Sequence, residues 1–231
     1  QGRVAGIKTS AGNLPCEMII MAAGIRPNTE FLNDSGIEMF KGTILTDDQM
    51  KTNLDDVYAA GDCVMVKKRQ MCIRDREGRT LAQVLAGAQK SYPGVLGTGV
   101  VKLPGLNAGR TGLTEAQAKE AGYDVVTALV PTDDKAHYYP DASFFITKLI
   151  ADRSTRKLLG VQVFGPGSVD KMVDIAVMGL NMGAVLDDFE NADFAYAPPF
   201  STAIHPFVQA VYVLMNKLDG TIVSMTPAEY A

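Results

Sequence analysis

The sequence of 231 residues predicts an α/β unit followed by an α+β unit. Short apolar segments separated by polar turns fill the chain up to residue 90, whereas strand and amphipathic-helix patterns alternate clearly after residue 99. Between these two textures, Tyr92-Pro93-Gly94 and the glycines at 97 and 99 interrupt every periodic pattern. We therefore expect a first domain over 1–93, a second over 97–220 and a tail over 221–231.

The composition is that of a soluble globular protein. Hydrophobic residues make up 47% of the chain and charged residues 21%, unlike the low-hydrophobicity, high-charge composition of disordered chains. A net charge of −4 argues against nucleic acid as a partner, and no apolar run approaches the roughly 20 residues that span a bilayer. Three cysteines and two histidines argue against a disulfide scaffold and against a metal site. We expect a cytoplasmic protein without membrane, nucleic acid or metal.

The first unit is expected to consist mainly of short strands. Residues 17–23 form an unbroken apolar run, which is typical of a strand buried on both faces of a sheet. The chain opens in half a hairpin without an initiator Met, which predicts that it is part of a longer protein. The expected elements are strands at 4–9, 17–23, 43–46 and 57–60, and a helix at 80–90 with Leu81, Val84, Leu85 and Ala88 on one face.

The second unit combines strands with amphipathic helices. Thr114 and Gln117 form a capping box for a helix that ends at Gly122, and Ser168 is expected to cap a second helix. The last helix, about 202–218, is apolar on two faces, which fits either deep burial or a subunit interface. The expected strands are 100–103, 125–130, 144–150 and 158–164, the last two forming a hairpin.

The most specific local signal is the sequence TNLDDVYAAGDC at 52–63. It predicts a short buried strand that ends, without bulky side chains, at Gly61 and Asp62. Glycine allows a ligand to approach the backbone closely. A carboxylate at the carboxyl end of a strand can accept hydrogen bonds from hydroxyl groups at the usual ligand position of open α/β sheets. The alternative is an ordinary Gly-Asp turn without a ligand.

A second segment, AAGIRPN at 22–28, makes the first more specific. Together the two segments resemble the FAD-dependent pyridine nucleotide-disulfide oxidoreductases. In that family the first segment leads from the NAD(P)H-binding domain back to the FAD domain, and the acid of the second binds the ribityl chain of the flavin. The resemblance implies that Asp62 binds FAD and that Gly61 allows its close approach. It also implies that 1–93 ends an NAD(P)H-binding domain and completes a Rossmann-like FAD-binding domain.

The resemblance extends into the second domain. KLIADRSTRKLLGVQVFG at 148–165 is similar to the central hairpin of the family's C-terminal dimerisation domain, which implies a homodimer. YAPPFS at 196–201 is similar to a motif of the NADH oxidase and coenzyme A-disulfide reductase branch, whose tyrosine faces the other subunit's active site. Tyr196 is therefore the catalytic candidate, as a proton or hydrogen-bond donor to a sulfur or peroxide leaving group; the alternative is a packed interface tyrosine. His205 stands where many relatives carry an acid, and we interpret it as a helix-start residue.

Three features depart from the family. A G-x-G-x-x-G dinucleotide loop is absent from these 231 residues. The redox cysteine is also absent, because Cys16 and Cys63 do not match its position and are interpreted as small hydrophobic residues. The basic stretch KKRQMCIRDREGR at 67–79 replaces a small-residue segment whose amides meet the flavin ring. It is interpreted as a solvated loop, an anionic-substrate patch, or an assembly artefact containing translated adapter sequence.

These observations predict part of a flavin-dependent oxidoreductase that passes electrons from NAD(P)H through FAD to a small-molecule disulfide, persulfide or polysulfide, or to oxygen. The alternative is a non-catalytic dimerisation or interaction module. Thr226, Pro227 and Glu229 form a helix start near the end of the chain. This start predicts either a frayed tail or a continuation, such as the rhodanese domain of some relatives, which would favour a sulfur substrate.

Overall fold

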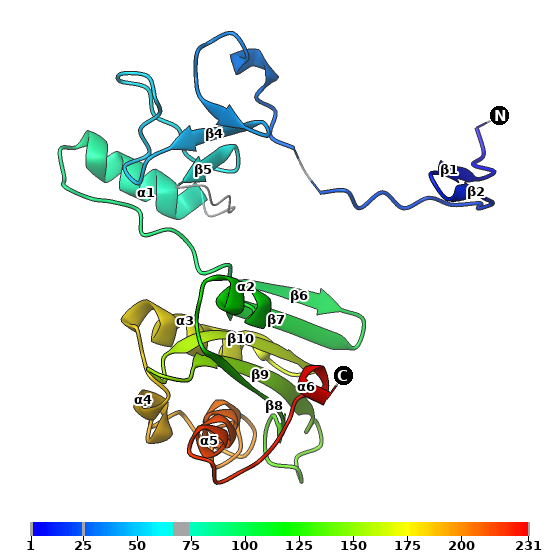
Figure 1. Cartoon of the computed structure of the whole chain (residues 1–231), viewed down its shortest axis with the longest axis vertical. Helices are drawn as coiled ribbons and strands as arrows, with labels where there is room; N and C mark the ends of the chain where they lie inside the picture. The colour runs from blue at the N-terminus through cyan, green and yellow to red at the C-terminus, as the bar shows by residue number, and fades with distance from the viewer. Residues whose placement is uncertain (1, 25, 67–73, 231) are drawn as a thin grey trace. The chain divides into compact units, whose positions relative to one another are not determined.

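Figure 1 shows the computed structural model, which describes residues 2–24, 26–66 and 74–230. The chain divides into two compact units, Gln1–Gly94 and Val95–Ala231, each with its own sheets and helices. Over the described ranges, no helix combines the length and the apolar character needed to cross a membrane.

The first unit contains a three-stranded sheet and a separate hairpin. Its elements are β1 (Ile7–Thr9), β2 (Gly12–Leu14), the 3-10 helix η1 (Glu30–Leu32), β3 (Met39–Phe40), β4 (Thr43–Thr46), β5 (Val64–Val66) and α1 (Arg74–Leu85). In the sheet, β4 lies antiparallel to β3 on one side and parallel to β5 on the other. The hairpin pairs β1 with β2, so the strand expected at 4–9 forms only in its second half.

The prediction of a buried strand at 17–23 is wrong. This segment pairs with no described strand, and its large side chains Met18, Ile20 and Met21 are exposed. A strand that is apolar on both faces needs neighbouring strands and a covering layer on each side. Within the part of the chain that the structure describes, the segment has neither, so it stays extended and unpaired.

Two further expectations for the first unit are corrected. At 57–60 only one bridge forms, between Lys51 and Tyr58, because both edges of β4 are already occupied by β3 and β5. The helix expected at 80–90 is α1, which begins earlier and ends earlier. Acidic residues in its first turn favour that start through the helix dipole, and Gly87, with φ of 86°, follows its end.

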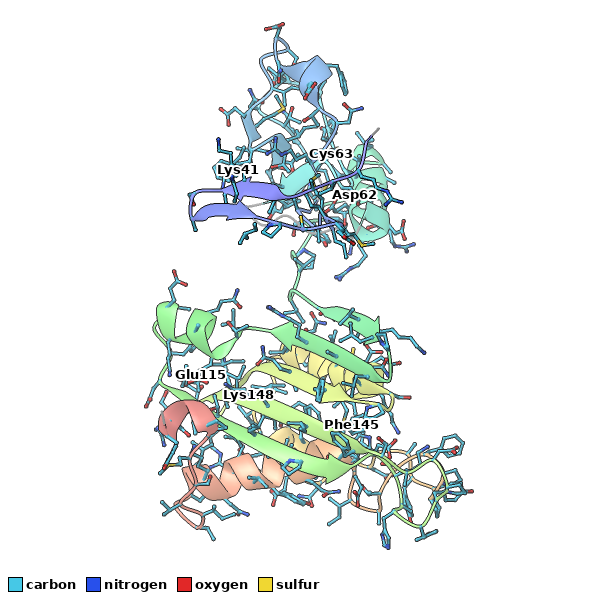
Figure 2. The ribbon with its side chains drawn as sticks, turned by 90° about the vertical axis from the view of Figure 1, so that its right-hand side faces the viewer. Lys41, Asp62, Cys63, Glu115, Phe145 and Lys148 are labelled. Atoms are coloured by element: carbon cyan, nitrogen blue, oxygen red, sulfur yellow. The ribbon has the colours of Figure 1, made fainter. Side chains whose placement is uncertain are left out.

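The second unit is a five-stranded antiparallel sheet with α3 and α5 packed on one face (Figures 1 and 2). Its strands run in the order β6-β7-β10-β9-β8, and all four strands expected from the sequence are present. The strands are β6 (Gly99–Leu103), β7 (Leu106–Gly112), β8 (Val125–Asp133), β9 (Phe144–Asp152) and β10 (Leu158–Gly165). The helices are α2 (Glu115–Glu120), α3 (Val169–Met182), α4 (Asp187–Glu190), α5 (Pro206–Leu218) and α6 (Pro227–Tyr230).

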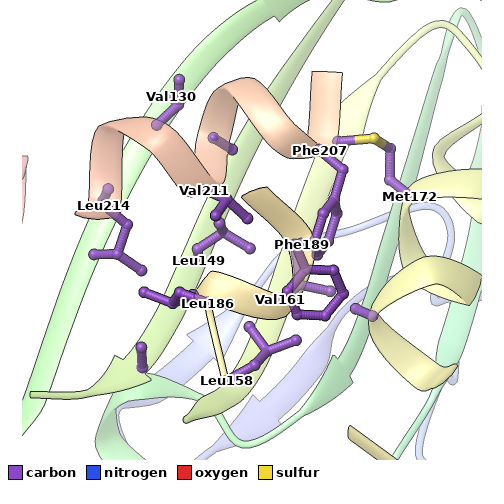
Figure 3. Close-up of a cluster of buried hydrophobic side chains, with 14 of the residues drawn as sticks. Val130, Leu149, Leu158, Val161, Met172, Leu186, Phe189, Phe207, Val211 and Leu214 are labelled. Carbon is purple, nitrogen blue, oxygen red and sulfur yellow. The ribbon is translucent and has the colours of Figure 1, made fainter. Parts of the chain in front are cut away.

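The core of the second unit lies between the sheet and the helices α3, α4 and α5 (Figure 3). Leu149 of β9 and Val161 of β10 belong to this core together with Phe207 and Val211 of α5, and all four side chains are fully buried. The Phe207 ring packs on Phe189 of α4 with 5.1 Å between ring centroids. Each such side chain contributes about 1.5–3 kcal/mol on burial. Most apolar side chains on both faces of α5 are thus buried within this unit, with Val213 and Leu218 partly buried, which fits the first alternative, deep burial.

The opposite face of the sheet is only partly covered. At one end, Ala118 of α2 packs on Ile150 and Leu159, and Lys148 of β9 donates a 2.6 Å hydrogen bond to Oε2 of Glu115, which holds α2 against the sheet (Figure 2). Elsewhere this face forms an open groove of about 600 Å³. We call this region the open face; its exposed apolar side chains include Val101, Leu129 and Phe164.

The helices of the second unit start close to the predicted positions, but not every predicted capping hydrogen bond forms. The capping box at Thr114 and Gln117 is confirmed, with both hydrogen bonds formed. Ser168 precedes α3 as expected, but its side chain makes no capping hydrogen bond. The last helix begins at Pro206 rather than near 202, because His205 occupies the N-cap. The helix start at the end of the chain is confirmed as α6, where Glu229 accepts from the Thr226 N–H.

We expect Gly112→Ala to destabilise the second unit strongly. A Cβ at Gly112 would meet the Leu159 carbonyl oxygen and lie 2.8 Å from the Gly160 Cα, and backbone atoms cannot move aside. Gly105 has nearly the same φ, 72° against 73°, but open space around it, so Gly105→Ala isolates the conformational strain. Strain costs about 1–2 kcal/mol in either variant, and the clash adds about 1–3 kcal/mol for Gly112 alone. Urea unfolding measures both; equal losses would contradict the clash.

Candidate functional site

The Gly-Asp motif forms a tight turn that leads into β5. Gly61 has φ of 107°, a conformation that favours glycine. Its carbonyl accepts a 3.0 Å hydrogen bond from the Val64 N–H, and the Ile44 N–H of β4 donates to the Cys63 carbonyl. Gly61 is buried and Asp62 is exposed. The sequence predicted Asp62 at the carboxyl end of a strand, whereas the structure places it in the turn before one.

A buried carboxylate from α1 completes this turn. The Gly61 N–H donates a 2.7 Å hydrogen bond to Oε2 of Glu77, which is 2% exposed. Burial raises the pKa of Glu77; the hydrogen bond from Gly61 opposes this shift, and the charge of Asp62 adds to it. Sequence reasoning missed Glu77, because 16 residues separate it from Gly61 and no local pattern signals the contact.

The turn fits a ligand that carries several hydroxyl groups. A carboxylate accepts hydrogen bonds only, so the exposed Asp62 side chain suits hydroxyl donors. Ala59 and Ala60 leave little side-chain bulk before it. Figure 2 shows Asp62 and Cys63 together in the first unit. The residues present therefore fit the ribityl chain of a flavin.

Tyr196 lies in the second unit, on the loop between α4 and α5. Its side chain is 52% exposed. The loop is tied by the Phe200 N–H, which donates to the Ala197 carbonyl at 2.8 Å, and by the Ala136 N–H, which donates to the Pro198 carbonyl at 3.4 Å. The phenol is thus presented on a hydrogen-bonded loop rather than packed inside its own unit. Asp62 belongs to the other unit, so no single unit contains both candidates.

The structure confirms that His205 is a helix-start residue. Its Nδ1 accepts a hydrogen bond from the Phe207 N–H at 3.2 Å, which caps α5. The ring is 6% exposed and packs against Phe194, with 4.8 Å between centroids. Burial, with the positive charge of Lys171, lowers the pKa of His205 to about 4. The imidazole is therefore neutral at pH 7.

The basic stretch at 67–79 and the cysteines are the other residues considered from the sequence. The basic stretch falls outside the described residues over 67–73, and its continuation to 79 lies in α1. Cys16 and Cys63 are free, partly exposed thiols. In the described part of the chain, no three His, Cys, Asp or Glu side chains are grouped to hold a metal ion.

Two family models match the chain, each over one part. Residues 1–89 match pyridine nucleotide-disulphide oxidoreductase, and residues 100–207 match the dimerisation domain of the same family. The chain belongs to the pyridine nucleotide-disulphide oxidoreductase family. The predicted family and fold class are therefore confirmed.

Members of this family with related sequences are known from several organisms. The chain is 36% identical over 222 residues to NAD(P)H coenzyme A polysulfide/persulfide reductase from Pyrococcus horikoshii, covering 92% of this chain and 50% of that protein. It is 29% identical over 201 residues to coenzyme A disulfide reductase from Staphylococcus aureus, covering 82% and 45%. The solved structure of an NAD-dependent persulfide reductase from A. fulgidus matches with a TM-score of 0.85 and 32% identity, covering 96% and 43%. The chain spans about half the length of the curated relatives it matches.

We expect acid to destabilise the second unit through His205. Its pKa is about 4 in the folded protein against 6.5 ordinarily, so the unfolded chain takes up the proton first. The free energy of unfolding should fall as the pH drops from about 6.5 to about 4, by at most about 1.4 kcal/mol per pH unit. His205→Asn keeps an N-cap acceptor and should remove this dependence, whereas His137→Asn, at an exposed histidine, should not. Urea unfolding at several pH values measures the slope; an unchanged slope in His205→Asn would contradict the assignment.

Proposed function

We propose that the chain is part of a flavin-dependent oxidoreductase that passes electrons from NAD(P)H through FAD to a disulfide, persulfide or polysulfide, or to oxygen. The observation that carries the proposal is the Gly61–Asp62 turn, which presents an exposed carboxylate on a backbone with little side-chain bulk. The named polysulfide/persulfide and coenzyme A disulfide reductases among the relatives support a small sulfur compound as the acceptor.

The roles of the candidate residues follow from their chemistry. Asp62 accepts hydrogen bonds from the ribityl hydroxyls, and the buried Gly61 supplies the φ of 107° that the turn before Asp62 requires. When bound, FAD supplies the electron transfer between NAD(P)H and the acceptor. Tyr196 donates a proton or hydrogen bond to the sulfur or peroxide that leaves, and it reaches the active site of the partner subunit from its exposed loop.

A homodimer formed through the second unit is part of this proposal. The match of 100–207 to a dimerisation domain supports it, and the open face offers apolar surface of the kind that marks interaction sites. We place the protein in the cytoplasm, because its three cysteines do not form a disulfide pattern. The net charge of −4 supports a small-molecule substrate rather than nucleic acid.

The second candidate function is a non-catalytic dimerisation or interaction module. The observation that favours it is the missing G-x-G-x-x-G loop, since the chain offers no such loop to dinucleotide phosphates. An absorbance spectrum of the purified chain distinguishes the two. Bound flavin supports the oxidoreductase, and dimers without flavin support the module.

We expect Asp62→Ala to weaken FAD binding by roughly ten- to a hundredfold, because a hydrogen bond to a charged group contributes about 1.5–3 kcal/mol. Quenching of FAD fluorescence on titration with protein measures the affinity. Asp55→Ala, which removes another exposed carboxylate from the same unit, serves as the control. Equal affinities for wild type and Asp62→Ala would contradict the assignment.

We expect Tyr196→Phe to lower turnover while FAD binding stays unchanged. General acid catalysis contributes about a hundredfold or more, and phenylalanine removes the proton donor alone. The assay is NADH-dependent reduction of coenzyme A disulfide by a protein that joins this chain to the family's upstream domain. Tyr138→Phe, another exposed tyrosine of the second unit, shows whether any loss is specific to Tyr196. Wild-type turnover in Tyr196→Phe would contradict the catalytic role and favour the alternative, a packed interface tyrosine.

We expect the chain to be a dimer in solution and Phe164→Glu to make it monomeric. A charge in the middle of the open face would have to be desolvated on dimerisation. Met182→Glu, on an exposed position of α3, is the matched control and should leave the dimer intact. Sedimentation or light scattering gives the mass, and a monomeric wild type would refute the dimer.

A further inference from the structure

We propose that Glu77 is a positioning residue, which holds the Gly61–Asp62 turn in the shape that presents the Asp62 carboxylate to the ribityl chain of FAD. This inference rests on the proposed function and adds a residue to the site. Glu77 itself is 2% exposed, so it acts through the turn and not by reaching the ligand from solvent.

Hydrogen bonds fix both sides of Gly61. Its N–H donates to Oε2 of Glu77 at 2.7 Å, and its carbonyl accepts from the Val64 N–H at 3.0 Å. These two bonds hold the peptide groups before and after the Gly61 Cα, and so they hold its φ of 107°. Asp62 follows directly in the chain, so the same two bonds help to fix the position of its backbone.

The turn needs a restraint such as Glu77 because the residue at position 61 is glycine. A glycine populates many backbone conformations when nothing restrains it, and this one sits immediately before the residue that binds the ligand. The N–H is buried with its residue, so removal of its acceptor leaves an unpaired donor. The turn would then rearrange to reach water and would carry Asp62 with it.

The helix that bears Glu77 is anchored to the same unit. The Arg76 guanidinium lies over the Tyr92 ring, 5.7 Å from its centroid. The Tyr92 N–H in turn donates a 2.7 Å hydrogen bond to the Asp48 carbonyl. Glu77 therefore extends from a restrained helix turn, which is what a positioning residue requires.

The test compares two substitutions that remove the same charge. Glu77→Gln keeps an oxygen that can accept from the Gly61 N–H, and Glu77→Ala does not. We expect Glu77→Ala to weaken FAD binding about tenfold, and Glu77→Gln to stay within about threefold of wild type. Asp75→Ala, an exposed acid in the same helix turn, is the charge-matched control and should bind like wild type.

A double-mutant cycle separates positioning from a general structural role. If Glu77 acts through Asp62, then Glu77→Ala has no further effect on FAD affinity once Asp62 is alanine. A tenfold loss in both backgrounds, equal affinities of Glu77→Ala and Glu77→Gln, or wild-type affinity in Glu77→Ala would each overturn the inference. Thermal unfolding of every variant shows whether the unit remains folded.

Hydrogen exchange at the Gly61 amide, measured without flavin, tests the positioning role of Glu77 separately from the proposed function. We expect slow exchange in wild type and Glu77→Gln, and fast exchange in Glu77→Ala. If the Gly61 amide exchanges slowly in wild type but no FAD binds, the hydrogen bond to Glu77 is present and the proposed function is contradicted. The role of Glu77 toward FAD then fails with it. Equal exchange in wild type and Glu77→Ala contradicts the positioning role directly.

Discussion

Burial of α5 against β8 and β9 is the interaction on which the second unit depends. Phe207, Val211 and Leu214 of this helix are fully buried, and together they close the core over the sheet. Because His205 caps α5, the packing of the helix also fixes the end of the loop before it. Tyr196 is carried on that loop. The placement of the catalytic candidate thus depends on the packing of α5 as well as on the hydrogen bonds within its loop.

The first unit depends more on hydrogen bonds than on a core. Of the largest fully buried side chains in the described chain, only Met50 and Val64 lie in this unit. An unpaired buried N–H costs about 1–3 kcal/mol, which is a large share of the stability available to a unit with so small a core. The hydrogen bond from Gly61 to Glu77 therefore matters both for the local shape of the turn and for the unit that contains it.

The sequence predicted the elements whose stability is local or periodic. Strands with a buried face, the capping box at Thr114, the helix start at His205 and the family motifs all leave patterns within a few residues. The prediction of a strand at 17–23 was wrong because a strand that is apolar on both faces needs neighbouring strands and covering layers. No local sequence pattern shows whether these are present. Glu77 was missed for the same reason, since the fold alone brings it to Gly61.

Acid acts in opposite directions on two buried titratable groups, Glu77 and His205. The pKa of Glu77 is raised in the folded protein, so its protonation favours the folded first unit as the pH falls. The pKa of His205 is lowered to about 4, so its protonation disfavours the folded second unit as the pH falls from about 6.5 to about 4. The two groups lie in different units, and each unit responds to its own group. Protonation therefore removes the buried charge of Glu77 beside the Asp62 turn, whereas at His205 it weakens the start of α5, at the end of the loop that carries Tyr196.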